Sequence, residues 1–182
     1  TARAFNRVYD LKLTVRGEME LAYNGEITTP SRCGRMDQGC AFGDRAVMME
    51  FDGERLTTEE VRPANDLHFV IVNLNASKDT LEILKRLNRS YPFAETELER
   101  GVQQLLGPIN KRIVAEAREA LEAGAEERLG TLMTEAQAFF DRYAGPACPE
   151  ELTAPVLHKV LAHEALRPHV WGGKGVGSQG DG

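Results

Sequence analysis

Basic blocks, long apolar runs and paired cysteines are all missing from this sequence of 182 residues. The 22 Lys and Arg residues are outnumbered by 28 Asp and Glu residues and are spread along the chain, so neither a nucleic acid nor a membrane surface is an expected partner. No stretch approaches the ~20 apolar residues needed to cross a bilayer, and no secretory hydrophobic region is seen. The cytoplasm is therefore the expected location.

Cysteine and histidine are too scarce and too badly spaced to predict a metal site. The chain has three cysteines, Cys33, Cys40 and Cys148, and none of them forms a C-x-x-C pair. An odd, sparse set indicates free thiols in a reducing compartment. His158 and His163 are five residues apart, so they do not share a helical face. We predict no protein-bound metal ion.

The remaining composition is that of an ordinary globular protein, with 42% hydrophobic residues and enough chain for one domain or two small ones. Residues 2–9 read as a helix, and Thr14 caps a second helix that ends near Asn24-Gly25. A chain that opens inside an apolar helix is expected to be a piece of a longer protein. Two strands, 46–51 and 55–61, are joined by the turn signal Asp52-Gly53.

The second part of the chain reads as mostly helical, between two apolar β-type segments. Residues 67–74 are nearly continuous β-type sequence and predict a central strand, and residues 169–171 predict another. Between them, apolar stripes predict several helices. Ser77 caps the first of these helices, in which Leu81, Leu84 and Leu87 point inward, and Thr153 caps the last. Helices without regular strand–helix alternation indicate an α+β fold.

The first candidate site is the segment Cys33-Gly34-Arg35-Met36-Asp37-Gln38. A carboxylate at the start of a short helix, beside arginine, is held ionised and suits accepting a hydroxyl proton. The alternative interpretation is that Asp37 only caps the helix, which aspartate often does.

The second candidate site is the glycine-rich segment 172–182, Gly-Gly-Lys-Gly-Val-Gly-Ser-Gln-Gly-Asp-Gly. Closely spaced glycines let backbone N–H groups surround a phosphate. A flexible linker has the same composition. The glycines at 175, 177 and 180 also spell G-x-G-x-x-G, which would predict a dinucleotide-binding oxidoreductase if a strand preceded and a helix followed.

Together, the two segments resemble the GHMP kinases, the galactokinase and mevalonate kinase group. The first is similar to the galactokinase and arabinokinase motif C-G-I/V-M-D-Q, with Arg35 where those kinases carry an aliphatic residue. The second is similar, more loosely, to the family's third motif, K-L/T-T/S-G-A-G-G-G-G. A weaker likeness covers residues 76–80, where the family begins a helix near the substrate.

The resemblance implies a two-domain α+β kinase, with a partial N-terminal domain in residues 1–75 and a partial C-terminal domain in residues 76–182. It implies ATP and Mg²⁺ as cofactors, with a sugar as the small-molecule substrate, and it allows a homodimer. Asp37 would be the catalytic base. Substrate contacts would come from Gly34, Arg35 and Gln38, and the phosphate loop would comprise Gly173, Lys174, Gly175, Gly177, Ser178 and Gly180.

The resemblance also leaves open three questions about the protein. The family's ATP loop, P-x-x-x-G-L-x-S-S-A, is expected before residue 1, and a further strand is expected after residue 182. Mevalonate or another hydroxy acid is the alternative substrate. A non-catalytic, ligand-binding descendant of the same fold is the alternative from outside the enzymes. We also expect Asp37 and the glycine loop to line one cleft.

Overall fold

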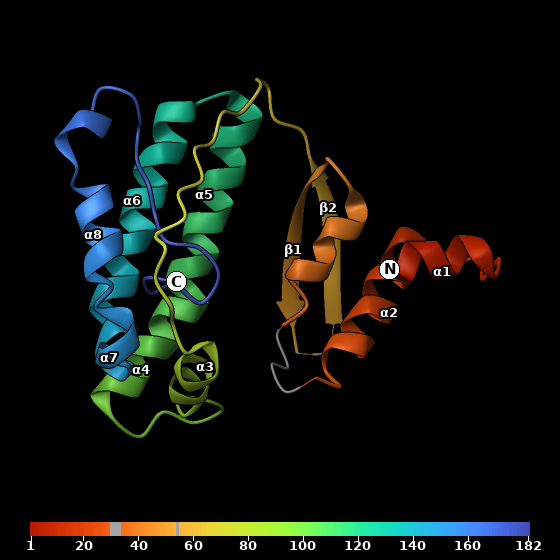
Figure 1. The fold of residues 1–182 in the computed structure, drawn as a ribbon, viewed down its shortest axis with the longest axis horizontal. Coiled ribbons are helices and arrows are strands. Elements are labelled where there is room, and N and C mark those ends of the chain that lie inside the picture. Colours follow the sequence, from red (N-terminus) through yellow and green to blue (C-terminus); the bar gives the residue numbers. More distant parts are fainter. Residues whose placement is uncertain (30–33, 54) are drawn as a thin grey trace. The chain divides into compact units, whose positions relative to one another are not determined.

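The computed structural model describes residues 1–29, 34–53 and 55–182, and it divides the chain into two compact units (Figure 1). Unit 1 comprises Thr1–Arg62, and unit 2 comprises Pro63–Gly182. Helices account for 54% of the chain, and the sheet found in the described part is a two-stranded antiparallel one. The α+β class is therefore confirmed at the level of a mixed helical and antiparallel structure.

Unit 1 is built from two helices, a short 3₁₀ helix and a β-hairpin. Its elements are α1 (Ala2–Val8), α2 (Val15–Glu26), η1 (Asp37–Phe42), β1 (Ala46–Asp52) and β2 (Arg55–Val61). The predicted Thr14 cap is confirmed, because the Thr14 side chain accepts a hydrogen bond from the Gly17 N–H. The hairpin is also confirmed, with Ala46 opposite Val61 and Asp52 opposite Arg55.

A buried carboxylate ties the two helices of unit 1 together. Glu18, on α2, accepts hydrogen bonds from Arg3 Nε and Asn6 Nδ2 on α1, each at 2.8 Å. These bonds, that of Asn6 foremost, lower the pKa of Glu18. Asn6 Nδ2 also donates to the Leu13 carbonyl, and Asn6 Oδ1 accepts from the Leu13 N–H.

Unit 2 is helical, with several helices running side by side (Figure 1). Two apolar clusters form its core, one around Ile83, Val102 and Cys148 and the other around Ile113 and Leu132. None of the helices in the described part of the chain is both long and apolar enough for a membrane span. The elements are α3 (Thr80–Asn88), α4 (Glu97–Gln104), η2 (Leu105–Ile109), α5 (Asn110–Ala123), α6 (Glu126–Tyr143), η3 (Gly145–Ala147), α7 (Pro149–Leu152), α8 (Pro155–Leu161) and η4 (Glu164–Leu166).

The predicted strands at 67–74 and 169–171 are wrong. Both segments lack regular secondary structure. Phe69, Val70 and Ile71 are 59%, 79% and 90% exposed. A strand exists only through its hydrogen bonds to a neighbouring strand, and within the described residues no strand pairs with either segment. A run of β-type residues is therefore not sufficient to predict a strand.

Two predicted helix caps are also wrong. Helix α3 is capped by Asp79, whose side chain accepts from the Glu82 N–H, and not by Ser77. Leu87 lies inside as predicted, together with Ile83, whereas Leu81, also expected to point inward, is 52% exposed. Helix α8 begins after Ala154, which adopts a left-handed conformation (φ 43°), and not at Thr153.

Candidate functional site

The glycine-rich segment forms a defined loop on unit 2. Three of its residues have left-handed backbone angles, Gly177 (φ 63°), Gln179 (φ 65°) and Gly180 (φ 78°). The Gln179 N–H donates to the Val176 carbonyl at 3.1 Å and closes a turn at the tip. Glycine is needed at 177 and 180 because side chains rarely adopt these angles.

One face of α6 holds the first half of the loop. Thr134 Oγ1 accepts from the Gly173 N–H at 3.3 Å, and Gln137 Oε1 accepts from the Gly175 N–H at 2.7 Å. One turn earlier, Gly130 lies directly against the backbone of Trp171, where a Cβ would come within 2.4 Å of the Trp171 Cβ. Spacings of four and three residues place all three positions on one helical face.

The Lys174 amine is turned toward the loop's own backbone. Its Nζ donates to the Gly175 carbonyl at 2.6 Å, and Gln179 Nε2 donates to the same oxygen at 3.0 Å. Burial lowers the pKa of Lys174, because the charged amine loses hydration. Lys174 therefore braces the loop in this structure, and its contact with a phosphate stays a prediction.

The far end of the loop is fastened to α8 and lies against α3. The Asp181 carboxylate accepts from the backbone N–H groups of Val156 (3.1 Å) and Leu157 (2.8 Å). A Cβ on Gly182 would come within 2.8 Å of the Lys78 backbone nitrogen, and one on Gly180 within 2.9 Å of the Glu151 carbonyl oxygen. The loop is thus pinned at both ends, which argues against a flexible linker.

The tip of the loop meets the start of α3, 98 residues away in sequence. Ser178 Oγ lies 3.2 Å from Thr80 Oγ1, within hydrogen-bond distance. A Cβ on Gly177 would be 3.9 Å from Lys78 Nζ. Partial burial lowers the pKa of Lys78. The structure thus brings two segments singled out in the sequence, 76–80 and 172–182, into contact.

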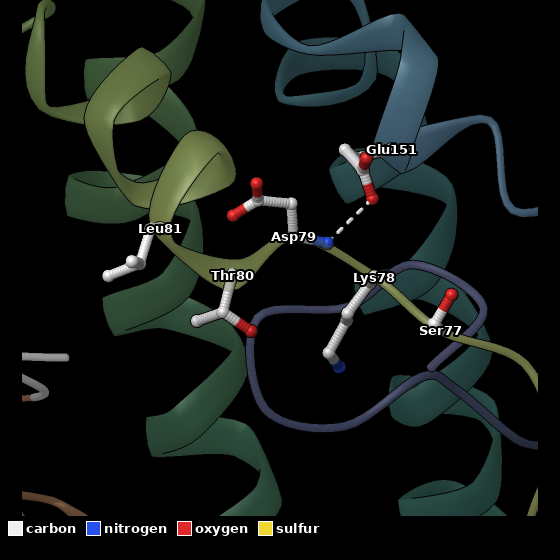
Figure 2. Close-up of a pocket in the computed structure, with 6 residues that line it drawn as sticks. All are labelled: Ser77, Lys78, Asp79, Thr80, Leu81 and Glu151. Carbon is white, nitrogen blue, oxygen red and sulfur yellow. Dashed lines mark hydrogen bonds between the residues drawn. The ribbon is translucent and has the colours of Figure 1, made fainter.

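An open pocket of about 430 Å³ lies along residues 77–81 and Glu151, next to this junction (Figure 2). The side chains of Lys78 and Thr80 point to the same side, toward the loop, while the Asp79 carboxylate points away from them (Figure 2). Glu151 Oε2 accepts from the Asp79 N–H at 2.9 Å and fixes this corner. The lining residues are Ser77, Lys78, Asp79, Thr80, Leu81 and Glu151. The lining combines a cation, hydroxyls and carboxylates, a set that can bind both phosphate oxygens and sugar hydroxyls.

The Asp37 segment belongs to unit 1, and each unit is described by itself. Asp37 is exposed in the first turn of η1, and Gly34 is exposed before it. The Arg35 guanidinium lies 4.6 Å from the Tyr23 ring centroid, and its Nε lies 3.6 Å from Glu20 Oε2. The buried Gln38 amide donates to the carbonyls of Gly34 (3.0 Å) and Arg35 (3.1 Å).

This geometry keeps the Asp37 carboxylate open to a ligand and uses Gln38 to close the turn before it. The substrate-contact roles of Gly34, Arg35 and Gln38 stay predictions. Residues 30–33, which include Cys33, lie outside the described part of the chain. The two described cysteines, Cys40 and Cys148, are free.

Sequence reasoning missed the residues that shape the loop from a distance. Gln137, Glu151 and Asp181 carry no local motif, and their partners lie between 24 and 72 residues away. A polar residue inside the apolar stripe of α6 was the available signal for Gln137. No group of three or more metal-ligating side chains gathers among the residues described.

Comparisons with known proteins give no match. No family model matches the chain. No curated protein and no solved structure matches it either. A strand does not precede the glycines, since residues 167–175 contain turns and irregular backbone, so the dinucleotide-binding interpretation lacks its first requirement.

Proposed function

We propose that this chain is part of a GHMP-type kinase that transfers the γ-phosphate of ATP to a hydroxyl group of a sugar. The observation that carries the proposal is the contact between Ser178, in the glycine loop, and Thr80, at the start of α3. The resemblance singled out both segments before their contact was known. The motif around Asp37 supplies the second, independent support.

Asp37 has the chemistry of the base in this proposal. Phosphoryl transfer depends mainly on positioning and on neutralising charge, so the protein needs one group to orient the acceptor hydroxyl and receive its proton. An exposed carboxylate at the start of a short helix meets that need. Arg35, held over Tyr23, would present the turn in a fixed conformation.

The glycine loop and the start of α3 would receive the phosphate groups. Where the loop meets the start of α3, donors come from the Lys78 amine, the hydroxyls of Thr80 and Ser178 and the backbone around Gly177. ATP, when bound, supplies the transferred phosphate. Mg²⁺ would be held mainly by phosphate oxygens and water, as is usual for this ion.

A sugar is the favoured acceptor over a hydroxy acid. The Met36-Asp37-Gln38 form resembles that of the sugar kinases. A mevalonate-type hydroxy-acid kinase is the alternative.

The test uses the natural protein in which this chain occurs, assayed with ATP and Mg²⁺ against a panel of sugars, sugar acids and mevalonate. We expect turnover with a sugar. Asp37→Asn should lower kcat by roughly 10²-fold or more, because it removes the proton acceptor. Asp44→Asn, an exposed acid just beyond η1, is the matched control and should leave kcat unchanged.

Two outcomes would contradict the proposal. Turnover of Asp37→Asn within a few-fold of the wild type would remove the base assignment. Binding of a sugar without any phosphate transfer would favour the non-catalytic descendant of the fold.

A further inference from the structure

Both sides of the Gly175 peptide are hydrogen-bonded by side chains. Its N–H donates to Gln137 Oε1, and its carbonyl accepts from Lys174 Nζ and Gln179 Nε2. We propose that Gln137 is a positioning residue, which fixes the glycine loop in the conformation that holds Ser178 against Thr80 at the start of α3. This inference rests on the proposed function for its consequence, but its geometry stands without it.

A glutamine suits this position because it must accept on one side and donate on the other. Gln137 Nε2 donates to Asp141 Oδ1 at 2.8 Å, one turn further along α6. An ionised carboxylate only accepts hydrogen bonds, so Asp141 fixes the orientation of the amide and points Oε1 at the Gly175 N–H. Hydrogen bonds are therefore donated in a single sequence, from Gly175 to Gln137 and from Gln137 to Asp141.

The surroundings make this bond costly to lose. Gln137 is 5% exposed, and Gly175 is buried. An unpaired N–H there would lose its bond without gaining one from water. The charged and titratable groups facing the amide are Asp141, His158, whose Nε2 lies 3.4 Å from Asp141 Oδ1, and the Lys174 amine beyond Gly175.

The position of the tip follows from this anchor. Gly175 lies two residues before Gly177, where the backbone turns left-handed. The tip residue Ser178 then reaches Thr80. If Gly175 is released from α6, Ser178 and Gly177 lose their fixed distance from Lys78 and Thr80.

The first experiment measures amide hydrogen exchange in the protein. We expect Gln137→Leu to lower the protection factor of the Gly175 amide by roughly tenfold or more. Gln103→Leu is the matched control, because it removes a glutamine that bonds to the backbone elsewhere: Gln103 donates to the carbonyls of Ser90 and Pro92, outside the loop. It should leave Gly175 protected. Unchanged protection in Gln137→Leu would overturn the inference.

The second experiment gives a signature that a mere packing defect would lack. In Gln137→Glu, an ionised carboxylate cannot donate to Asp141 and is repelled by it. The side chain at 137 is then pushed out of its place beside Gly175, so Gly175 protection should be low at pH 8. Once protonated, the introduced carboxyl group would again donate to Asp141 and accept from Gly175, so protection should recover as the pH falls. Gln137→Leu and the wild type, followed over the same pH range, are the controls for any other effect of pH on the exchange. A pH-independent Gln137→Glu variant would count against the proposal.

The third experiment connects the anchor to catalysis. In the natural protein, Gln137→Leu should reduce kcat roughly tenfold while the KM for the acceptor changes little, because misplacement acts on the phosphate end of the site. If the wild type transfers no phosphate, the proposed function fails, yet the exchange experiments still decide the role of Gln137. If the wild type is active and Gln137→Leu retains its full kcat, the positioning role is refuted.

Discussion

Substituting Gly130 by alanine sets helix propensity against the packing of the glycine segment. Gly130 lies inside α6, where alanine is favoured over glycine by about 1 kcal/mol. The structure predicts the opposite outcome. The added Cβ would come within 2.4 Å of the Trp171 Cβ and 2.6 Å of the Trp171 carbonyl carbon, and backbone atoms cannot yield as a flexible side chain does.

The magnitude follows from two alternatives for the segment at 171–175. If the segment stays in place, overpacking costs about 1–3 kcal/mol. If it shifts, the hydrogen bonds of Gly173 and Gly175 to α6 are lost, at about 1 kcal/mol each. Either cost is centred on about 2 kcal/mol, so after the gain of about 1 kcal/mol in helix propensity Gly130→Ala should be about 1 kcal/mol less stable than the wild type.

The assay is urea unfolding followed by circular dichroism, together with amide exchange at Gly173 and Gly175. Gly25→Ala is the control, because Gly25 lies in helix α2 with no atom within 4 Å of its added Cβ. It should be neutral or stabilising by up to about 1 kcal/mol. A Gly130→Ala protein that is as stable as the wild type, with both amides still protected, would refute the packing of this segment on α6.

Two further predictions concern stability outside the loop. Glu18→Gln should destabilise the protein at pH 7, with the gap in free energy of unfolding closing as the pH falls below the ordinary pKa range of a glutamate. The folded pKa of Glu18 is lowered, so its contribution is present above the unfolded pKa and lost as the pH falls through the folded one. Urea unfolding of both proteins across that range measures the gap, and a constant gap would contradict the buried Arg3–Glu18–Asn6 cluster. Ile71→Lys should change the free energy of unfolding by less than about 0.5 kcal/mol, since Ile71 is 90% exposed. A large loss of stability would instead support the buried strand that the composition of residues 67–74 predicts.

Two signals carried by neighbouring residues were read correctly from the sequence, although the caps predicted at Ser77 and Thr153 were not. Thr14 caps its helix, and Asp52-Gly53 turns the hairpin. Both depend on contacts within a few residues, which the sequence displays directly. The segments at 67–74 and 169–171 failed for the opposite reason, because a strand depends on a partner that composition does not identify.

The candidate site divides in the same way. Its glycines and hydroxyls were visible in the sequence as a motif. The two segments 76–80 and 172–182, each of which resembles a kinase segment, contact one another in the structure. The hydrogen bond from the Lys174 amine to the Gly175 carbonyl could not be predicted, since it depends on how the loop is anchored. Gln137 and Asp181 bond to partners 38 and 24 residues away, so the neighbouring residues do not identify those partners.

The most direct test of the proposed phosphate transfer is a crystal structure of the natural protein with a non-hydrolysable ATP analogue, Mg²⁺ and the acceptor sugar. We predict the terminal phosphate against Gly177, Ser178 and Lys78, with an acceptor hydroxyl about 2.6–3.2 Å from the Asp37 carboxylate. A nucleotide bound away from the glycine loop, or a sugar out of reach of Asp37, would contradict the account.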